Sequence, residues 1–195
     1  MRENRWRTLI TACLIVSILG ISPEKISAEE YIGRTGIVIG GWAGYGLMDV
    51  NTEDSSRSSH GTFALGFKGG YAITSRVIMG LELNGWTLKA YNIKDPSKGE
   101  TVSNVSIFIN YFPFKYLPIY FAGGGGQISY TNNSPSVNGR DKGGSWFFGS
   151  GYEYQISNKL MLVPQIRYSQ GNFTGGNFNV YEIALGMNWR SGSNK

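Results

Sequence analysis

The chain has 195 residues, of which 16% are charged and 14% aromatic; this is enough for one domain and leaves no obvious room for two. Its 28 glycines are spread through apolar and aromatic segments, without the strict period of collagen or the Pro/Ser-rich composition of a disordered tail. We therefore expect one folded domain in which the glycines belong to strands and turns.

The N-terminus has the order of a secretory signal peptide. Basic residues precede an apolar run of 13 residues, 9–21, and a polar stretch that ends at Ala28. The run is short against the roughly 20 residues that a transmembrane helix needs, which favours a cleaved leader. We predict that residues 1–28 are a signal peptide and that residues 29–195 form the mature domain.

Cysteine and charge exclude several kinds of chemistry. Cys13 is the only cysteine, and it lies within the predicted leader with most of the apolar run after it, so we expect neither a lipid anchor nor disulfides. The mature chain keeps 14 basic and 11 acidic residues, a net charge of +3. Charge this weak and scattered does not indicate nucleic acid binding.

Beyond the leader, segments of about a dozen residues alternate apolar with small or polar positions, which is the pattern of β-strands. In residues 60–73, Phe63, Leu65 and Phe67 share one face and Lys68 lies on the other. Seven further segments show the same pattern: 35–48, 76–86, 103–112, 118–130, 145–156, 159–169 and 179–189.

The connections alternate between long and short. Long polar connections are expected at 49–59, 92–101, 131–144 and 170–177, and tight turns around 74–75, 115–116 and 157–158. An even number of antiparallel strands with this asymmetry is typical of bacterial outer-membrane barrels. We predict an all-β, closed, up-and-down transmembrane barrel of about eight strands, exported through the periplasm to the outer membrane, with four surface loops.

The polar face of the strands carries ionisable side chains from five segments: Lys68, Glu82, Glu153, Arg167 and Glu182. A soluble barrel that used this face as its core would bury charges at high cost. A soluble periplasmic barrel could instead bury the apolar face around an apolar ligand, and periodicity alone leaves that alternative open.

Aromatic residues near the strand ends favour the membrane, because rings with one polar atom suit the two lipid–water interfaces. These residues are Tyr45, Tyr71, Tyr111, Phe112, Tyr120, Tyr130, Tyr154, Tyr168 and Trp189. An eight-stranded barrel leaves an interior just wide enough for side chains. We therefore predict that the five ionisable groups form a packed ionic network inside the barrel, with no open pore.

Three stretches resemble a known family: GYAITSRVIMGLELNGW, FGSGYEYQISNKLMLVPQIRYS and the closing EIALGMNW. They are similar to the superfamily of small outer-membrane β-barrels that includes the membrane domain of OmpA and OmpX. The resemblance covers essentially the whole mature chain and implies an architecture, with little about activity.

The resemblance also implies partners. In the family the last strand is read by the barrel-assembly machinery, a role that Tyr181, Gly186 and Trp189 fit, although residues 190–195 extend beyond the usual aromatic end. The partners we expect are this machinery, outer-membrane lipid and lipopolysaccharide, and an extracellular partner for the loops. No nucleic acid partner is expected.

Some barrels of this kind are enzymes that modify lipid A with a histidine, a serine and an acidic residue. Their His-x-Ser-Asn motif is replaced here by residues 167–170, Arg-Tyr-Ser-Gln, which leaves Ser169 without a general base. The only histidine, His60, lies at the edge of the first predicted loop, and the acidic residues of the loops match no calcium-binding spacing. We expect no catalysis, no cofactor and no metal; the alternative is a lipid A-modifying enzyme.

Overall fold

A computed structural model of the chain describes residues 34–52, 55–89, 100–132 and 139–192. The predicted signal peptide lies outside these residues. In these ranges nine strands follow one another: β1 (Gly36–Thr52), β2 (Ser55–Thr74), β3 (Val77–Lys89), β4 (Glu100–Tyr111), β5 (Ile119–Asn132), β6 (Gly139–Tyr152), β7 (Tyr154–Gln155), β8 (Leu160–Phe173) and β9 (Gly176–Arg190). Within the described ranges, no helix is long and apolar enough to cross a membrane.

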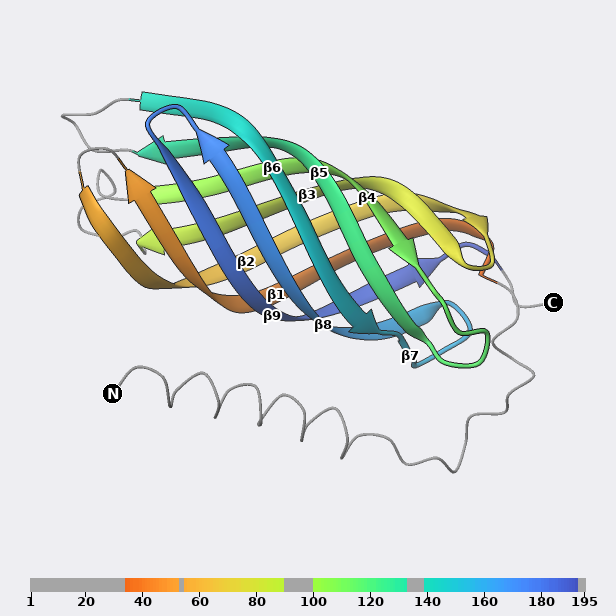
Figure 1. Ribbon diagram of the computed structural model, residues 1–195. Helices are drawn as coiled ribbons and strands as arrows, with labels where there is room; N and C mark the ends of the chain where they lie inside the picture. The colour runs from red at the N-terminus through yellow and green to blue at the C-terminus, as the bar shows by residue number, and fades with distance from the viewer. Residues whose placement is uncertain (1–33, 53–54, 90–99, 133–138, 193–195) are drawn as a thin grey trace. The chain divides into compact units, whose positions relative to one another are not determined.

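The sheet closes on itself. Each strand from β1 to β5 pairs antiparallel with the next, β8 pairs with β9, and β9 returns to pair with β1. β6 and the two-residue β7 both pair with β8, on either side of Glu153, so they act as one interrupted strand and the wall has eight positions. The prediction of a closed, eight-stranded antiparallel barrel is confirmed, and Figure 1 shows the strands winding around it.

The strands are longer than the sequence suggested. β2 has 20 residues, and the expected loops 49–59 and 131–144 are mostly strand. The expected loop 170–177 is a tight hairpin in which Thr174 and Gly175 join β8 to β9, with Gly175 at a φ of 81° that favours glycine. The prediction of long loops at these three places is therefore wrong, while the fourth, 92–101, lies mostly outside the described residues.

These loops were predicted because they are rich in polar residues, but apolar side chains occupy inward-facing positions in two of them. Val50 near the end of β1 and Phe173 at the end of β8 are each only 8% exposed and belong to one cluster of buried apolar side chains. Alternation therefore continues to Val50 on β1 and to the end of β8, where Gln170 and Asn172 lie on the outer face.

Over most of the barrel wall, the outer face is apolar. Phe67 is 67% exposed, Leu81 60% and Ile107 58%, although each is a large hydrophobic side chain. Their neighbours in sequence, such as Lys68 and Glu82, are buried in the interior. This arrangement inverts that of a water-soluble protein and is the one that a hydrocarbon surrounding requires.

Large aromatic rings fill the interior by lying against glycines on neighbouring strands. A Cβ atom added to any of these glycines would meet the facing ring. The pairs are Gly66 with Trp42, Gly124 with Phe147, Gly151 with Tyr120, and Gly171 with Phe178. Because an eight-stranded barrel has little internal volume, the small residues make room for the large ones.

Replacing Gly124 by valine is expected to destabilise the fold by about 1–3 kcal/mol, because a side chain there overlaps the Phe147 ring and the Ile107 carbonyl. Gly123 is the matched control, since a Cβ there has only the Phe147 carbonyl oxygen within 4 Å, at 3.8 Å. The Gly123→Val change should cost less than about 0.5 kcal/mol. Urea midpoints of both variants in lipid vesicles provide the measurement, and equal midpoints would contradict this packing.

Candidate functional site in the barrel interior

All five ionisable residues that the sequence singled out lie inside the barrel. Their exposed fractions run from 1% to 9%. Lys68 comes from β2, Glu82 from β3, Arg167 from β8 and Glu182 from β9, while Glu153 occupies the break between β6 and β7. Alternation places the four residues that belong to strands on the inward faces of those strands.

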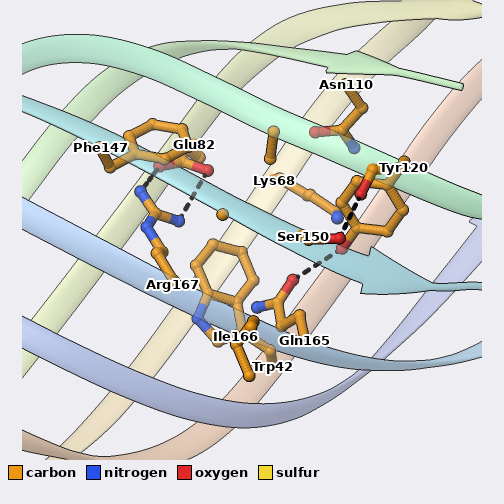
Figure 2. A pocket seen from close by; sticks show the side chains of 12 residues that line it. Trp42, Lys68, Glu82, Asn110, Tyr120, Phe147, Ser150, Gln165, Ile166 and Arg167 are labelled. Atoms are coloured by element: carbon orange, nitrogen blue, oxygen red, sulfur yellow. Dashed lines mark hydrogen bonds and ion pairs between the residues drawn. The ribbon is translucent and has the colours of Figure 1, made fainter. Parts of the chain in front are cut away.

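Glu82 and Arg167 form the central ion pair. Arg167 Nη2 contacts Glu82 Oε1, and Arg167 Nη1 donates to Glu82 Oε2 at 3.2 Å, so the two groups meet as a fork, as Figure 2 shows. The guanidinium lies 3.5 Å from the centre of the Phe147 ring, and its Nε donates to Ser169 Oγ at 3.3 Å. A buried pair with this geometry compensates both charges.

Glu182 is held by two tryptophans. Trp42 Nε1 donates to its Oε1 at 3.0 Å, and Trp86 Nε1 donates to its Oε2 at 2.9 Å. Indole N–H groups can only donate, so both rings are fixed in orientation by the same carboxylate. Glu182 thereby links β1, β3 and β9 across the interior.

Glu153 forms a second ionic cluster with two arginines that the sequence reasoning missed. Its carboxylate contacts Arg190, lies 3.6 Å from Arg34 Nε, and accepts from Asn188 Nδ2 at 3.2 Å. Arg190 continues the inward alternation of β9 through Glu182 and Asn188, so extending the pattern past Trp189 would have found it. Arg34 precedes the first strand, and no pattern in the sequence marks it.

Lys68 differs from the other buried charges. No ion pair joins it to any residue that the structure describes; instead, its Nζ lies 5.7 Å from the centre of the Tyr120 ring and 5.9 Å from those of Trp42 and Phe108. It borders a cavity of about 20 Å³, room for roughly one water molecule. Figure 2 shows Lys68, Tyr120 and Gln165 around this cavity.

The buried groups thus separate into smaller units, where the sequence predicted one packed ionic network. The interior also contains two clusters of apolar side chains, and the sequence analysis did not predict these clusters. One contains Met48, Val50, Ala64, Trp86, Val102, Ile128, Phe173, Phe178 and Val180. The other contains Val38, Ala72, Ile78, Phe108, Phe112, Tyr120, Phe147, Met161 and Val163. The prediction assigned large apolar residues to the outer face only, whereas the interior needs them to fill space.

The aromatic residues divide between the two faces. Exposed fractions are 62% for Tyr45, 57% for Tyr71, 46% for Tyr111, 56% for Tyr154 and 41% for Trp189, and Tyr168 is partly exposed on the same outer face. Phe112 and Tyr120 were wrongly expected at a lipid interface, since they are 0% and 1% exposed in the interior, and Tyr130 packs against an internal cluster. The prediction used only the position of these residues near strand ends, and it did not consider that the alternation of each strand turns their side chains inward.

The remaining predicted positions lie on β9, apart from His60 on β2. Tyr181 and Trp189 are exposed on the outer face, and Gly186 faces inward beside Trp42. His60 pairs with Met48 in the β1–β2 ladder, but its side chain lies outside what the structure describes. Within the described ranges, no group of three His, Cys, Asp or Glu side chains could hold a metal ion.

A closed barrel with an apolar outer wall and buried ionic groups defines an integral membrane β-barrel. The family model described as outer membrane protein beta-barrel domain matches residues 11–190, so the chain belongs to this family and is a protein of the bacterial outer membrane. None of the curated proteins matches the sequence.

Solved structures show the same fold. Neisserial surface protein A is 16% identical, with a TM-score of 0.56 over 81% of this chain and 99% of that one. Ail, the attachment invasion locus protein of Yersinia pestis, is 11% identical, with a TM-score of 0.50 over 79% of this chain and 99% of that one. Identities this low extend the likeness to the fold and no further.

Proposed function

We propose that this protein is a non-enzymatic outer-membrane barrel with a filled, non-conducting interior, and that its role is structural or lies in interactions at the cell surface. The observation that carries this proposal is the layering of the interior. The layer with the Glu82–Arg167 pair, Lys68 and Glu182 lies among aromatic rings, and a further apolar cluster contains Met48 and Phe178. A hydrated ion passing through would have to displace packed side chains.

Charge compensation supports the same proposal. A water-filled channel keeps its ionisable groups hydrated, whereas here the carboxylates of Glu82, Glu153 and Glu182 each receive donors from other strands. The cavity beside Lys68 has room for about one water molecule and is not a passage.

The absence of catalysis is part of the proposal. Ser169, the serine that matches the lipid A deacylase motif in position, is 1% exposed and accepts a hydrogen bond from Arg167 Nε. A guanidinium stays protonated and cannot serve as a general base. The buried serine also faces the interior, away from the lipid that such an enzyme would modify.

Export and assembly complete the proposed function. Residues 1–28 would direct secretion through the periplasm, and the outward Tyr181 and Trp189 with Gly186 on β9 would be read by the barrel-assembly machinery. The ends of the hairpins β1–β2, β3–β4, β5–β6 and β8–β9 would lie outside the cell and contact an extracellular partner.

Planar-bilayer recording tests the filled interior. Purified, folded protein is expected to give no stable channel openings, while a porin inserted into the same bilayers serves as the positive control. A stable large conductance from the folded protein would overturn the proposal.

A further inference from the structure

The outer face of the barrel changes character along the strands. On β8, the outward side chains Ile166 and Tyr168 are followed by Gln170 and Asn172; on β9, reading from the other end, Ile183 and Tyr181 are followed by Asn179. The same change from apolar to polar occurs at the hairpin ends of other strands. We call these polar outward positions the collar: they lie within 49–51, 85–87, 101–103, 127–131, 142–144, 170–172 and 177–179.

The inner face changes in the opposite sense at the same strand ends. Inside the collar lies the cluster of buried apolar side chains that contains Met48, Trp86, Val102 and Phe178, all four of them 0% exposed. Apolar residues inside and polar residues outside are the pattern of a water-soluble barrel, because amide side chains in hydrocarbon lose their hydrogen bonds to water. This end of the wall therefore stands outside the hydrocarbon.

Strand length agrees with this division. The outward apolar stretch of β9, from Tyr181 to Trp189, covers the 9–11 residues that span a bilayer as a tilted strand. β9 begins at Gly176, so its first residues extend beyond that stretch. At about 3.3 Å per residue, this extension reaches past the hydrocarbon into the headgroup layer.

Aromatic rings mark the boundary between the two parts. Tyr168 packs against Trp146 at 5.5 Å and Tyr181 at 4.8 Å between ring centres, and its hydroxyl donates to Asn179 Oδ1 at 2.9 Å. The ring faces lipid while the hydroxyl joins the amides of the collar, which is how a tyrosine sits at a membrane interface.

We infer that the collar is a surface for carbohydrate, which contacts the core sugars of the lipopolysaccharide around the barrel. Its outward side chains are mainly amides and hydroxyls, which both donate and accept hydrogen bonds as sugar hydroxyls require. Among the collar side chains that the structure describes, only Asp49 and Lys142 are ionisable, so the chemistry fits neutral sugars better than phosphates. The inference rests on the outer-membrane location and is independent of the filled interior.

Site-directed spin labelling tests the inference. The only native cysteine is Cys13, in the predicted leader, so single cysteines can be placed without other changes. Labels at Gln170 and Asn172 are compared with labels at Leu162 and Ile166, matched controls on the same face of β8. Asn177 and Ile183 on β9 supply an independent pair if a β8 variant does not fold.

In phospholipid vesicles, the collar labels should be open to a water-soluble nickel chelate, and the control labels to dissolved oxygen. Adding lipopolysaccharide should slow the collar labels and reduce their access to the chelate several-fold, while lipid A without its core sugars should do so less. Oxygen access at the collar equal to that at Ile166 would overturn its position outside the hydrocarbon. Collar labels unaffected by lipopolysaccharide, or affected equally by lipid A alone, would overturn the contact with the core sugars.

Discussion

Replacing Arg167 by methionine is expected to destabilise the folded barrel by about 3–5 kcal/mol, because it leaves the carboxylate of Glu82 buried without its counter-charge. Glu82 is 4% exposed and receives both of its close contacts from the Arg167 guanidinium. The fraction that remains folded in urea, read from gel migration without boiling, measures the change.

A double variant separates the charge effect from the loss of packing. Replacing Glu82 and Arg167 together by methionine removes both charges and should recover most of the stability lost in the single variant. Lys142→Met, which removes an exposed charge on β6, should change stability by less than about 0.5 kcal/mol. A double variant no more stable than Arg167→Met would show that the cost does not come from an uncompensated charge.

Replacing Trp86 by alanine is expected to cost about 3–5 kcal/mol, since the ring is 0% exposed and packs against Phe178 at 5.7 Å between centres. The change also removes the indole N–H that donates to Glu182. Unfolding in urea, followed as for Arg167, provides the measurement.

Trp86→Phe distinguishes the two contributions. Phenylalanine keeps most of the buried ring but lacks the N–H that donates to Glu182. The expected loss of stability is about 1–3 kcal/mol, because the buried Glu182 carboxylate loses one hydrogen-bond donor. If the alanine variant proved as stable as the phenylalanine variant, the ring would not be part of a packed core.

The strand phases could be predicted from the sequence because a membrane barrel repeats one rule at every second residue. Lys68, Glu82, Arg167 and Glu182 were placed on the inward face by alternation alone, and they lie there. Alternation says which side a residue faces, but not what it meets across the interior. The division of the charges into a Glu82–Arg167 pair and a Glu153 cluster depends on contacts between distant strands.

Two kinds of feature escaped prediction for physical reasons. Large apolar residues such as Phe108 and Phe178 were not expected inside, because the inward face of a membrane barrel was taken to be small and polar. The extended hairpins were taken for loops because polarity was equated with irregular structure. Outside the hydrocarbon, a polar outward face is compatible with a strand, and the inward Val50 and Phe173 show that the strands continue.

Membrane fractionation with gel migration before and after boiling tests the central claim, a closed barrel in the outer membrane, most directly. The protein should be found in the outer-membrane fraction, require detergent for extraction, and migrate differently when boiled, because a closed barrel resists unfolding by the detergent of the gel until it is heated. Recovery from a periplasmic extract without detergent, with migration unchanged by boiling, would contradict the account.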